Sequence, residues 1–399
     1  MSPSFAEVKT IDLPTGRLAL EVHRSDWPLA ELCGFSARYN KARGYLFVSK
    51  VLGKHYPARP EAMERVYGRL GARLLALKLS GPTVLVAMAE TATGLGHGVF
   101  DAVQRQRPTL DWLFLHTTRY ALNHPVAFRL TEDHCHAREH LVYEPLSEEG
   151  KGILGAARNV VFIDDEMSSG DTMLHLGRAF LRRVPGVRRM VLASIKCWLD
   201  SPSRLRENFP LPVEIVSLLE GNFSFTPIPL PESEMPEFKS EGDWRQKDDI
   251  LPANFGRLGL TSGECLPGSA GARAAEARLR QLRDKLSLER GKPVLVLGTG
   301  EFAYLPYRLA RLLEEEGFRV TFQSTTRTPV KPCLDIARAL RFADNYHDGI
   351  DNFLYNVSPE PGRQTIICYE TRPPLPPGHD LPRILGAQTL FFGGETGAD

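Results

Sequence analysis

The chain has 399 residues, of which 42% are hydrophobic and 24% are charged, a globular composition that excludes general disorder. Lys and Arg total 49 and Asp and Glu total 48, so the formal net charge is +1. A chain this close to neutral has no overall field to hold a polyanion, and we expect neither a nucleic-acid nor a membrane partner. Any phosphate must then be bound by local loops.

The cysteines and the N-terminus indicate the compartment. The six cysteines, at positions 33, 135, 197, 265, 333 and 368, form no Cys-x-x-Cys pair, which argues against a zinc ribbon or a redox dithiol. So few in a long chain fit reduced thiols better than a disulfide scaffold. Residues 1–16 contain no apolar signal core, and no apolar run approaches the roughly 18 residues of a membrane-spanning helix. These features predict a cytoplasmic protein.

Short apolar runs mark the strands of the first part of the chain. Residues 84–89, 160–163 and 190–195 are continuous apolar segments bounded by turns or helical patterns. Continuous runs are typical of strands covered on both faces, so we expect a parallel sheet with helices. Residues 200–255 are rich in Pro, Phe and acidic residues, and predict an irregular hood over this domain.

A second α/β unit follows a linker. Residues 259–271 have the composition of a linker, and the apolar residues Ala275, Leu279, Leu282 and Leu286 predict an amphipathic helix. Strands are then predicted at 294–297 and 319–323, on either side of a Gly-rich turn and a helix ending near 316. The predicted organisation is a first α/β domain at 1–258, a linker at 259–271 and a smaller α/β domain at 272–399.

The clearest chemical motif is VVFIDDEMSSGDT, residues 160–172. Asp164 and Asp165 stand where the predicted strand ends, which is the edge at which open α/β sheets bind ligands. Residues 168–172 turn the chain into a helix, whose N-terminal N–H groups and dipole suit a phosphate. Paired carboxylates would repel a bare phosphate but suit sugar hydroxyls or Mg²⁺. The motif therefore predicts a ligand with a phosphate on one side and a diol, with Mg²⁺, on the other.

This motif resembles the 5-phosphoribosyl-1-pyrophosphate (PRPP) signature of type I phosphoribosyltransferases, which is four apolar residues, an acidic pair, a spacer and a Ser/Thr-Gly-x-Thr turn. The resemblance implies that family's fold, a Rossmann-like parallel sheet with a hood. It implies that Asp164 and Asp165 contact the ribose hydroxyls and also hold Mg²⁺, directly or through water. The full ribose and 5′-phosphate site implied by the resemblance is Asp164, Asp165, Glu166, Met167, Ser168, Ser169, Gly170, Asp171 and Thr172.

Two other segments fit the same family. The turn after residues 84–89 resembles the loop that holds pyrophosphate, because small residues let the backbone approach the ligand. Polar residues at 116–119 and 131–140 match the position of the mobile loop that covers the site. Arg119 and Arg138 are candidate catalytic residues there, since guanidinium groups match phosphate oxygens, with a solvated charged loop as the alternative. The predicted pyrophosphate loop is Glu90, Thr91, Ala92, Thr93 and Gly94.

The whole layout is similar to a bacterial family of orotate-phosphoribosyltransferase-like enzymes fused to a C-terminal domain named after a Thr-Arg-Ser-Pro (TRSP) motif. That family is associated with tellurite-resistance and stress gene clusters. The resemblance rests on residues 34–50, the acidic motif, residues 297–306 and residues 323–329, where Thr328 replaces the Ser of the naming motif. Neighbouring strand ends also suggest a second polar, phosphate-binding pocket. Its predicted residues are Gly298, Thr299, Gly300, Glu301, Thr325, Thr326 and Arg327.

The resemblance implies Mg²⁺-dependent transfer of phosphoribose from PRPP to a base-like nucleophile, with release of pyrophosphate. Purine-specific members often carry a carboxylate at the position of Ser168, so its absence favours an orotate-like, already acidic nucleophile. Two alternatives stay open: a non-catalytic PRPP or nucleotide-binding regulator, and an enzyme that cleaves nucleotides by the reverse or hydrolytic reaction. A homodimer is also left open.

Two other motifs are weaker. Residues 298–303 fit a loose dinucleotide fingerprint, but Gln323 stands where an acid for the ribose is expected. Residues 136–140 spell an inverted zinc-protease motif without a third ligand. We therefore expect neither NAD nor catalytic zinc. Basic residues gathered at 38–55, among them Lys50 and Lys54, predict either a local anion site or a solvated face.

Overall fold

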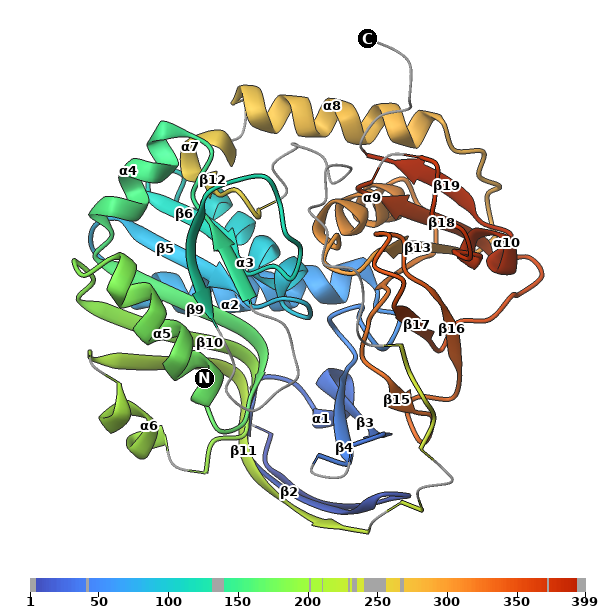
Figure 1. The fold of residues 1–399 in the computed structure, drawn as a ribbon, viewed down its shortest axis with the longest axis horizontal. Coiled ribbons are helices and arrows are strands. Elements are labelled where there is room, and N and C mark those ends of the chain that lie inside the picture. Colours follow the sequence, from blue (N-terminus) through green and yellow to red (C-terminus); the bar gives the residue numbers. More distant parts are fainter. Residues whose placement is uncertain are drawn as a thin grey trace. The chain divides into compact units, whose positions relative to one another are not determined.

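The computed structural model describes residues 5–40, 43–130, 140–200, 202–209, 211–228, 230–231, 235–239, 256–265, 269–371 and 373–392. Contacts between Cα atoms divide the chain into two compact units, each assembled from separate stretches of the sequence (Figure 1). Unit 1 comprises residues 1–63, 219–251 and 282–399, and unit 2 comprises residues 64–218 and 252–281. The domain boundaries expected from the sequence stay a prediction.

Unit 2 contains a mostly parallel sheet with the strand order β11-β10-β9-β5-β6-β12. Its strands are β5 (Thr83–Ala87), β6 (Trp112–His116), β9 (Asn159–Met167), β10 (Arg189–Cys197), β11 (Val213–Pro227, of which 213–218 lie in this unit) and β12 (Leu260–Thr261). Strands β10, β9, β5 and β6 are parallel, which confirms the α/β class indicated by the apolar runs. The register sets Ala87 beside Ile163 and His116, so the carboxyl ends of β5, β9 and β6 meet at one edge.

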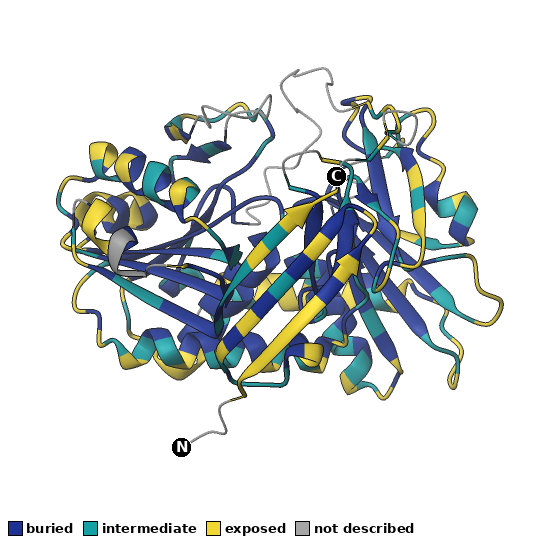
Figure 2. Ribbon diagram, turned by 90° about the horizontal axis from the view of Figure 1, so that it is seen from below, coloured by how far each residue is buried: buried dark blue, intermediate teal, exposed yellow. Residues whose placement is uncertain are grey.

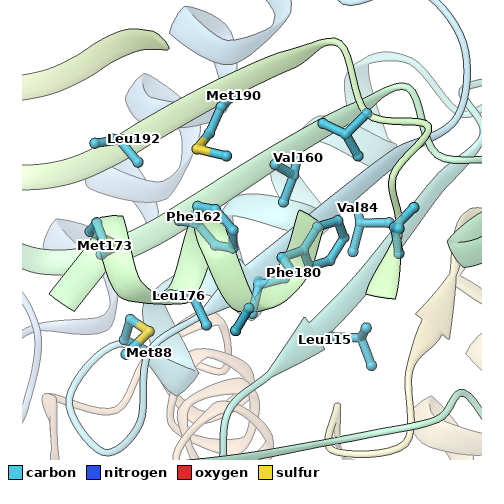
Figure 3. Close-up of a cluster of buried hydrophobic side chains, with 14 of the residues drawn as sticks. Val84, Met88, Leu115, Val160, Phe162, Met173, Leu176, Phe180, Met190 and Leu192 are labelled. Atoms are coloured by element: carbon cyan, nitrogen blue, oxygen red, sulfur yellow. The ribbon is translucent and has the colours of Figure 1, made fainter. Parts of the chain in front are cut away.

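Helices cover both faces of this sheet. They are α2 (Pro60–Ala76, which begins in unit 1), α3 (Thr93–Gln106), α4 (Glu148–Ala156), α5 (Asp171–Arg183), α6 (Pro202–Asn208) and α7 (Ser262–Cys265). Figure 3 shows α5 laying Leu176 and Phe180 against Val160 and Phe162 of the sheet. On the opposite face α3 approaches so closely that a Cβ on Gly96 would lie 2.3 Å from the Ala87 Cβ. Because both faces are buried, the strands carry no polar alternation.

Two features of unit 2 differ from the sequence-based expectation. Strand β9 continues to Met167, so Asp164 and Asp165 lie inside the strand rather than after it. The expected irregular hood is wrong for residues 213–227, which form β11, while residues 240–255 lie outside the described part of the chain. Strands β7 (Val126–Leu130) and β8 (His140–Tyr143) form an antiparallel ribbon on either side of residues 131–139, which are also outside it.

Unit 1 contains a second parallel sheet, with the order β14-β13-β18-β19. Its elements are β13 (Val294–Gly298), α9 (Tyr304–Glu315), β14 (Val320–Ser324), β18 (Gln364–Tyr369), α10 (Leu381–Leu385) and β19 (Gln388–Phe391). The predicted strand, turn, helix and strand of this region are confirmed. The predicted amphipathic helix is α8 (Ala270–Asp284), of which residues 270–281 belong to unit 2 and 282–284 to unit 1. Ala275 is exposed, and of the predicted apolar residues inside the helix only Leu279 and Leu282 are buried.

The N-terminal segment packs with the C-terminal one inside unit 1. The remaining elements are β1 (Glu7–Leu13), β2 (Gly16–Ser25), α1 (Leu29–Leu32), β3 (Cys33–Arg38), β4 (Tyr45–Ser49), β15 (Val330–Lys331), β16 (Ala339–Ala343) and β17 (Asp351–Tyr355). Strand β3 pairs with β4 on one side and with β15 on the other. Strand β2 alternates buried and exposed residues, as expected of an antiparallel strand with one open face (Figure 2). No helix in the described ranges is long and apolar enough to span a bilayer.

Candidate active site

Three strand ends of unit 2 bring most of the predicted site residues together. The Met88 N–H donates to the Ile163 carbonyl at 3.0 Å, and the Thr117 N–H donates to the Ala87 carbonyl at 2.9 Å. These bonds continue the sheet by one residue beyond β5 and β6. The predicted pyrophosphate loop, the acidic motif and the residues before Arg119 therefore share the edge at which parallel sheets bind ligands.

The acidic motif forms a charged cluster with a lysine. Asp164, Asp165 and Glu166 are consecutive and half-buried at the end of β9. Lys196 lies opposite Glu166 on β10, and its Nζ is 3.1 Å from Glu166 and 3.6 Å from Asp165. The lysine side chain is fully buried. Two of the three carboxylates thus pair with one ammonium group, and carboxylates outnumber ammonium groups in the cluster.

The neighbouring carboxylates change the pKa of Asp164. Burial, together with repulsion from Asp165 and Glu166, raises the pKa of Asp164 well above its usual value, although the Asp165 N–H donates to its Oδ1 at 2.8 Å. A cation or a set of hydroxyl donors would relieve this repulsion. Sequence reasoning missed Lys196, although a single lysine in the apolar run at 190–199 is a signal for a paired buried charge.

The turn after β9 leads directly into α5. Gly170 is the residue before the helix and has a φ of +82°, a conformation that favours glycine. A Cβ there would also lie 2.5 Å from Leu205. Ser169 is exposed, and its Oγ accepts the Asp171 N–H at 3.3 Å. The turn thus presents hydroxyl groups and the positive end of the α5 dipole, as the phosphate prediction requires.

The predicted pyrophosphate loop is short and tightly held. Helix α3 begins at Thr93, so Thr93 and Gly94 belong to its first turn. The Ala89–Glu90 peptide is cis, and the Ala89 N–H donates to Thr117 Oγ1 at 2.8 Å. Glu90 is buried. A buried carboxylate in this loop repels free pyrophosphate, so the loop favours pyrophosphate that is bound together with a cation.

The residues after β6 divide into a buried group and a more accessible arginine. His116 ends β6, and Thr117 and Thr118 are buried after it, so these three do not belong to a mobile covering loop. Arg119 is half-buried, and Arg138 lies outside the described residues.

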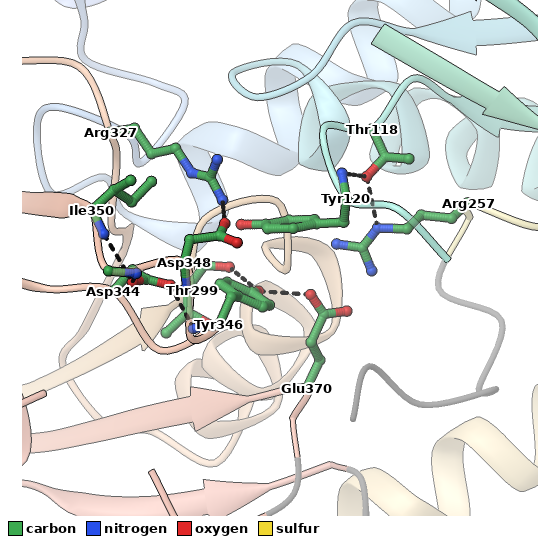
Figure 4. Close-up of polar contacts among 11 residues, drawn as sticks. Thr118, Tyr120, Arg257, Thr299, Arg327, Asp344, Tyr346, Asp348, Ile350 and Glu370 are labelled. Atoms are coloured by element: carbon green, nitrogen blue, oxygen red, sulfur yellow. Dashed lines mark hydrogen bonds and ion pairs between the residues drawn. The ribbon is translucent and has the colours of Figure 1, made fainter. Parts of the chain in front are cut away.

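An unpredicted arginine joins this group. The Nε of Arg257 donates to Thr118 Oγ1 at 3.2 Å, and its guanidinium lies 5.2 Å from the ring centroid of Tyr120 (Figure 4). Its side chain is almost entirely buried. No motif surrounds Arg257 in the sequence, so only the fold reveals its place.

The donor set suits Mg²⁺. Asp164 and Asp165 could each supply a hard oxygen ligand, and Mg²⁺ is usually bound through one or two carboxylates with water and substrate phosphates. Among the described residues there is no group of three or more His, Cys, Asp and Glu side chains arranged to hold a metal ion.

Comparison with known proteins identifies the family. A phosphoribosyl transferase model matches residues 32–222, and a model of the TRSP domain C-terminal to that transferase matches residues 254–375. Together the two models account for most of the chain. The protein is thus a phosphoribosyltransferase, a pentosyltransferase, with an α/β fold. More particularly, the chain belongs to the family in which this transferase carries a C-terminal TRSP domain.

Solved structures give weaker likenesses. Adenine phosphoribosyltransferase from Rhodothermus marinus is 14% identical, covering 48% of this chain and 96% of its own, with a TM-score of 0.29. The Giardia lamblia enzyme complexed with 9-deazaadenine is 12% identical, covering 47% and 93%, with a TM-score of 0.31. A Staphylococcus aureus hypoxanthine phosphoribosyltransferase is 13% identical, covering 42% and 78%, with a TM-score of 0.25. Scores of this size identify no substrate, and none of the curated proteins matches.

Proposed function

We propose that this enzyme transfers phosphoribose from PRPP to an orotate-like nucleophile and releases pyrophosphate, with Mg²⁺ as cofactor. The observation that carries the proposal is the meeting of three groups at one sheet edge. Half-buried carboxylates lie at the end of β9, and a turn with hydroxyl groups precedes α5. A tight loop follows β5, which is joined to β9 by the hydrogen bond from the Met88 N–H to the Ile163 carbonyl. These groups match the ribose hydroxyls, the 5′-phosphate and the pyrophosphate of one ligand.

Each group has a distinct task in this proposal. Asp164 and Asp165 accept hydrogen bonds from the ribose hydroxyls, and the buried Lys196 ammonium group holds Asp165 and Glu166 in place through ion pairs. Residues 168–172 hold the 5′-phosphate against the α5 N-terminus. Thr117 anchors the pyrophosphate loop by accepting the Ala89 N–H. Arg119, with Arg138, neutralises the departing pyrophosphate.

Mg²⁺, when bound, would offset charge on the pyrophosphate as its bond to the ribose C1 breaks. The chain's own part is to place the sugar and to exclude water, since water would hydrolyse the activated sugar. An already acidic nucleophile needs no general base, which suits Ser168 at the position where purine-specific relatives often carry a carboxylate. Tellurite-resistance or stress pathways, a cytoplasmic location and a homodimer belong to the same proposal.

Pyrophosphate release tests this function. The purified full chain is mixed with PRPP and Mg²⁺, and orotate, uracil, purines and small amides are offered in turn. We expect release with an acidic pyrimidine-like nucleophile, and loss of that release in Asp164→Asn/Asp165→Asn. The exposed Asp111→Asn is a matched control and should release pyrophosphate normally. PRPP binding without release for every nucleophile would contradict the enzyme and favour the regulator; release without a nucleophile would favour hydrolysis.

A further inference from the structure

The polar residues of the predicted second pocket in unit 1 bond to one another. Thr325 Oγ1 accepts the Gly300 N–H at 2.9 Å, and Arg327 pairs with the buried Asp348 at 2.9 Å (Figure 4). The Lys54 ammonium donates to the Gly300 carbonyl at 2.8 Å, so Lys54 is buried rather than part of a solvated face. The phosphate pocket expected there stays a prediction, whereas the start of the C-terminal family region makes contacts at the proposed transferase site.

The C-terminal family region begins inside unit 2. The TRSP model matches from residue 254, and residues 252–281 belong to unit 2. Strand β12 pairs antiparallel with β6, with Leu260 beside Phe114. The His116 N–H, at the end of β6, donates to the Gly256 carbonyl at 3.3 Å. Residues of the C-terminal family region therefore form the strand that lies next to β6 in the transferase sheet.

Arg257 reaches from this segment to the turn that follows β6. Its Nε donates to Thr118 Oγ1 at 3.2 Å, and its guanidinium lies 5.2 Å from the ring centroid of Tyr120 (Figure 4). The Tyr120 N–H donates to the same Thr118 oxygen at 3.2 Å. Arg257 is only 4% exposed, and its guanidinium keeps its charge at every pH at which proteins fold. One hydroxyl oxygen thus joins both ends of the 118–120 turn to a buried, permanently charged side chain.

Strand β8 fixes the same turn from another side. The backbone groups of Thr118 and Leu141 exchange two hydrogen bonds, each of 2.8 Å. The Tyr143 hydroxyl donates to the Tyr120 carbonyl at 2.9 Å. Arg119 lies between Thr118 and Tyr120, so its backbone is held on both sides while its side chain is half-buried. Such support keeps a functional side chain in a defined position before a ligand binds.

The residue before this turn holds the predicted pyrophosphate loop. Thr117 Oγ1 accepts the Ala89 N–H at 2.8 Å. In the proposed function, Arg119 neutralises the departing pyrophosphate, so residues 117–119 act on the pyrophosphate side of the site twice. A displacement of about 1 Å in such a segment can cost about 100-fold in activity.

We propose that Arg257, which the C-terminal family region supplies, is a positioning residue of the transferase site. It holds residues 117–120 so that Arg119 and the loop anchored by Thr117 meet the pyrophosphate of PRPP. This inference rests on the proposed function. It gives the fusion of the two family regions a structural reason, because the transferase takes one strand and one buried arginine from the region that follows it.

Calorimetry on the full chain with Mg²⁺ tests the role of Arg257. Arg257→Met should weaken PRPP binding about tenfold or more, but change the binding of ribose 5-phosphate, which has no pyrophosphate, by less than about twofold. Thr118→Val removes the acceptor and should reproduce this pattern, while Thr118→Ser should bind PRPP as wild type does. Arg183→Met is the matched control, because Arg183 pairs with Glu144 at the end of α5 farthest from the phosphate turn.

A double variant shows whether Arg257 acts through the turn. Arg119→Met should itself weaken PRPP binding. Arg119→Met/Arg257→Met should then lose clearly less affinity than the product of the two separate losses, because both substitutions disturb the same contact with pyrophosphate. Circular dichroism shows that each variant is folded, and Thr118→Val keeps the test decisive if Arg257→Met does not fold.

The outcomes separate this inference from the proposed function. If wild type binds PRPP, the inference alone is overturned by unchanged PRPP binding in Arg257→Met or Arg119→Met, by equal losses for PRPP and ribose 5-phosphate, or by losses that multiply in the double variant. Wild type that binds no PRPP would overturn the proposed function, and the role of Arg257 with it.

Discussion

Replacing Lys196 with Met should destabilise the protein strongly, because the ammonium group is the buried counter-charge of the acidic cluster. The Lys196 side chain has 0% exposure, while those of Asp165 and Glu166 keep 18% and 11%. Removing one partner of a buried ion pair typically costs 3–5 kcal/mol, since the remaining charge is left uncompensated. The residual exposure of the carboxylates places the expected loss near the lower end, about 3 kcal/mol.

Urea denaturation at neutral pH, followed by circular dichroism, measures this loss. Lys151→Met is the matched control, because Lys151 pairs with Glu148 at 2.6 Å but is 45% exposed, and exposed pairs contribute at most about 1 kcal/mol. Glu166→Gln in the Lys196→Met background should restore part of the lost stability by removing one uncompensated charge. Equal stability of the two lysine variants, or no recovery in the double variant, would refute the reasoning.

Three further substitutions test other parts of the structure. Asp164→Asn should raise the free energy of unfolding at neutral pH. The pKa of Asp164 is raised on folding, so the ionised carboxylate destabilises the folded state once the pH exceeds that raised pKa. Denaturation at several pH values should show that the gain in the variant vanishes below the unfolded pKa of about 3.9, where the carboxyl is protonated in both states. Gly96→Ala should cost about 1–3 kcal/mol by overpacking α3 against β5, whereas Gly152→Ala, in a helix with open space around it, should be neutral or stabilising; a thermal melt that ranks them the other way would contradict this. Lys54→Met should lower the free energy of unfolding by about 1.5–3 kcal/mol, because it removes the hydrogen bond that the buried Lys54 ammonium donates to the Gly300 carbonyl at 2.8 Å. An unchanged midpoint in urea denaturation would contradict this.

The sequence predicted the parallel sheets well because their strands are buried on both faces. Continuous apolar runs such as 160–163 are typical of strands whose side chains are buried on both faces of a sheet. Strands β9 and β10 lie where these runs predicted them. It failed at 213–227, where Pro and Phe suggested irregular structure. There β11 pairs with β2, and sequence neighbours do not reveal such a distant partner.

The candidate site was predictable to the extent that it is local in sequence. The acidic motif and the turn before α5 are contiguous, so their chemistry can be read from residues 160–172. Lys196 stands alone in an apolar run, which signals a paired buried charge but does not identify its partners on β9. Arg257 contacts Thr118 across more than a hundred residues of chain, and no local pattern encodes that contact. The same limit applies to Lys54, whose basic segment gives no sign that its ammonium is buried.

PRPP binding measured by calorimetry in the presence of Mg²⁺ tests the central claim most directly, because it needs no knowledge of the nucleophile. Wild type should bind PRPP with saturable heat, and Asp164→Asn/Asp165→Asn should lose that heat while remaining folded. Equal binding by the two proteins, or no binding by folded wild type at saturating PRPP, would contradict the assignment of the β9 carboxylates to the ribose.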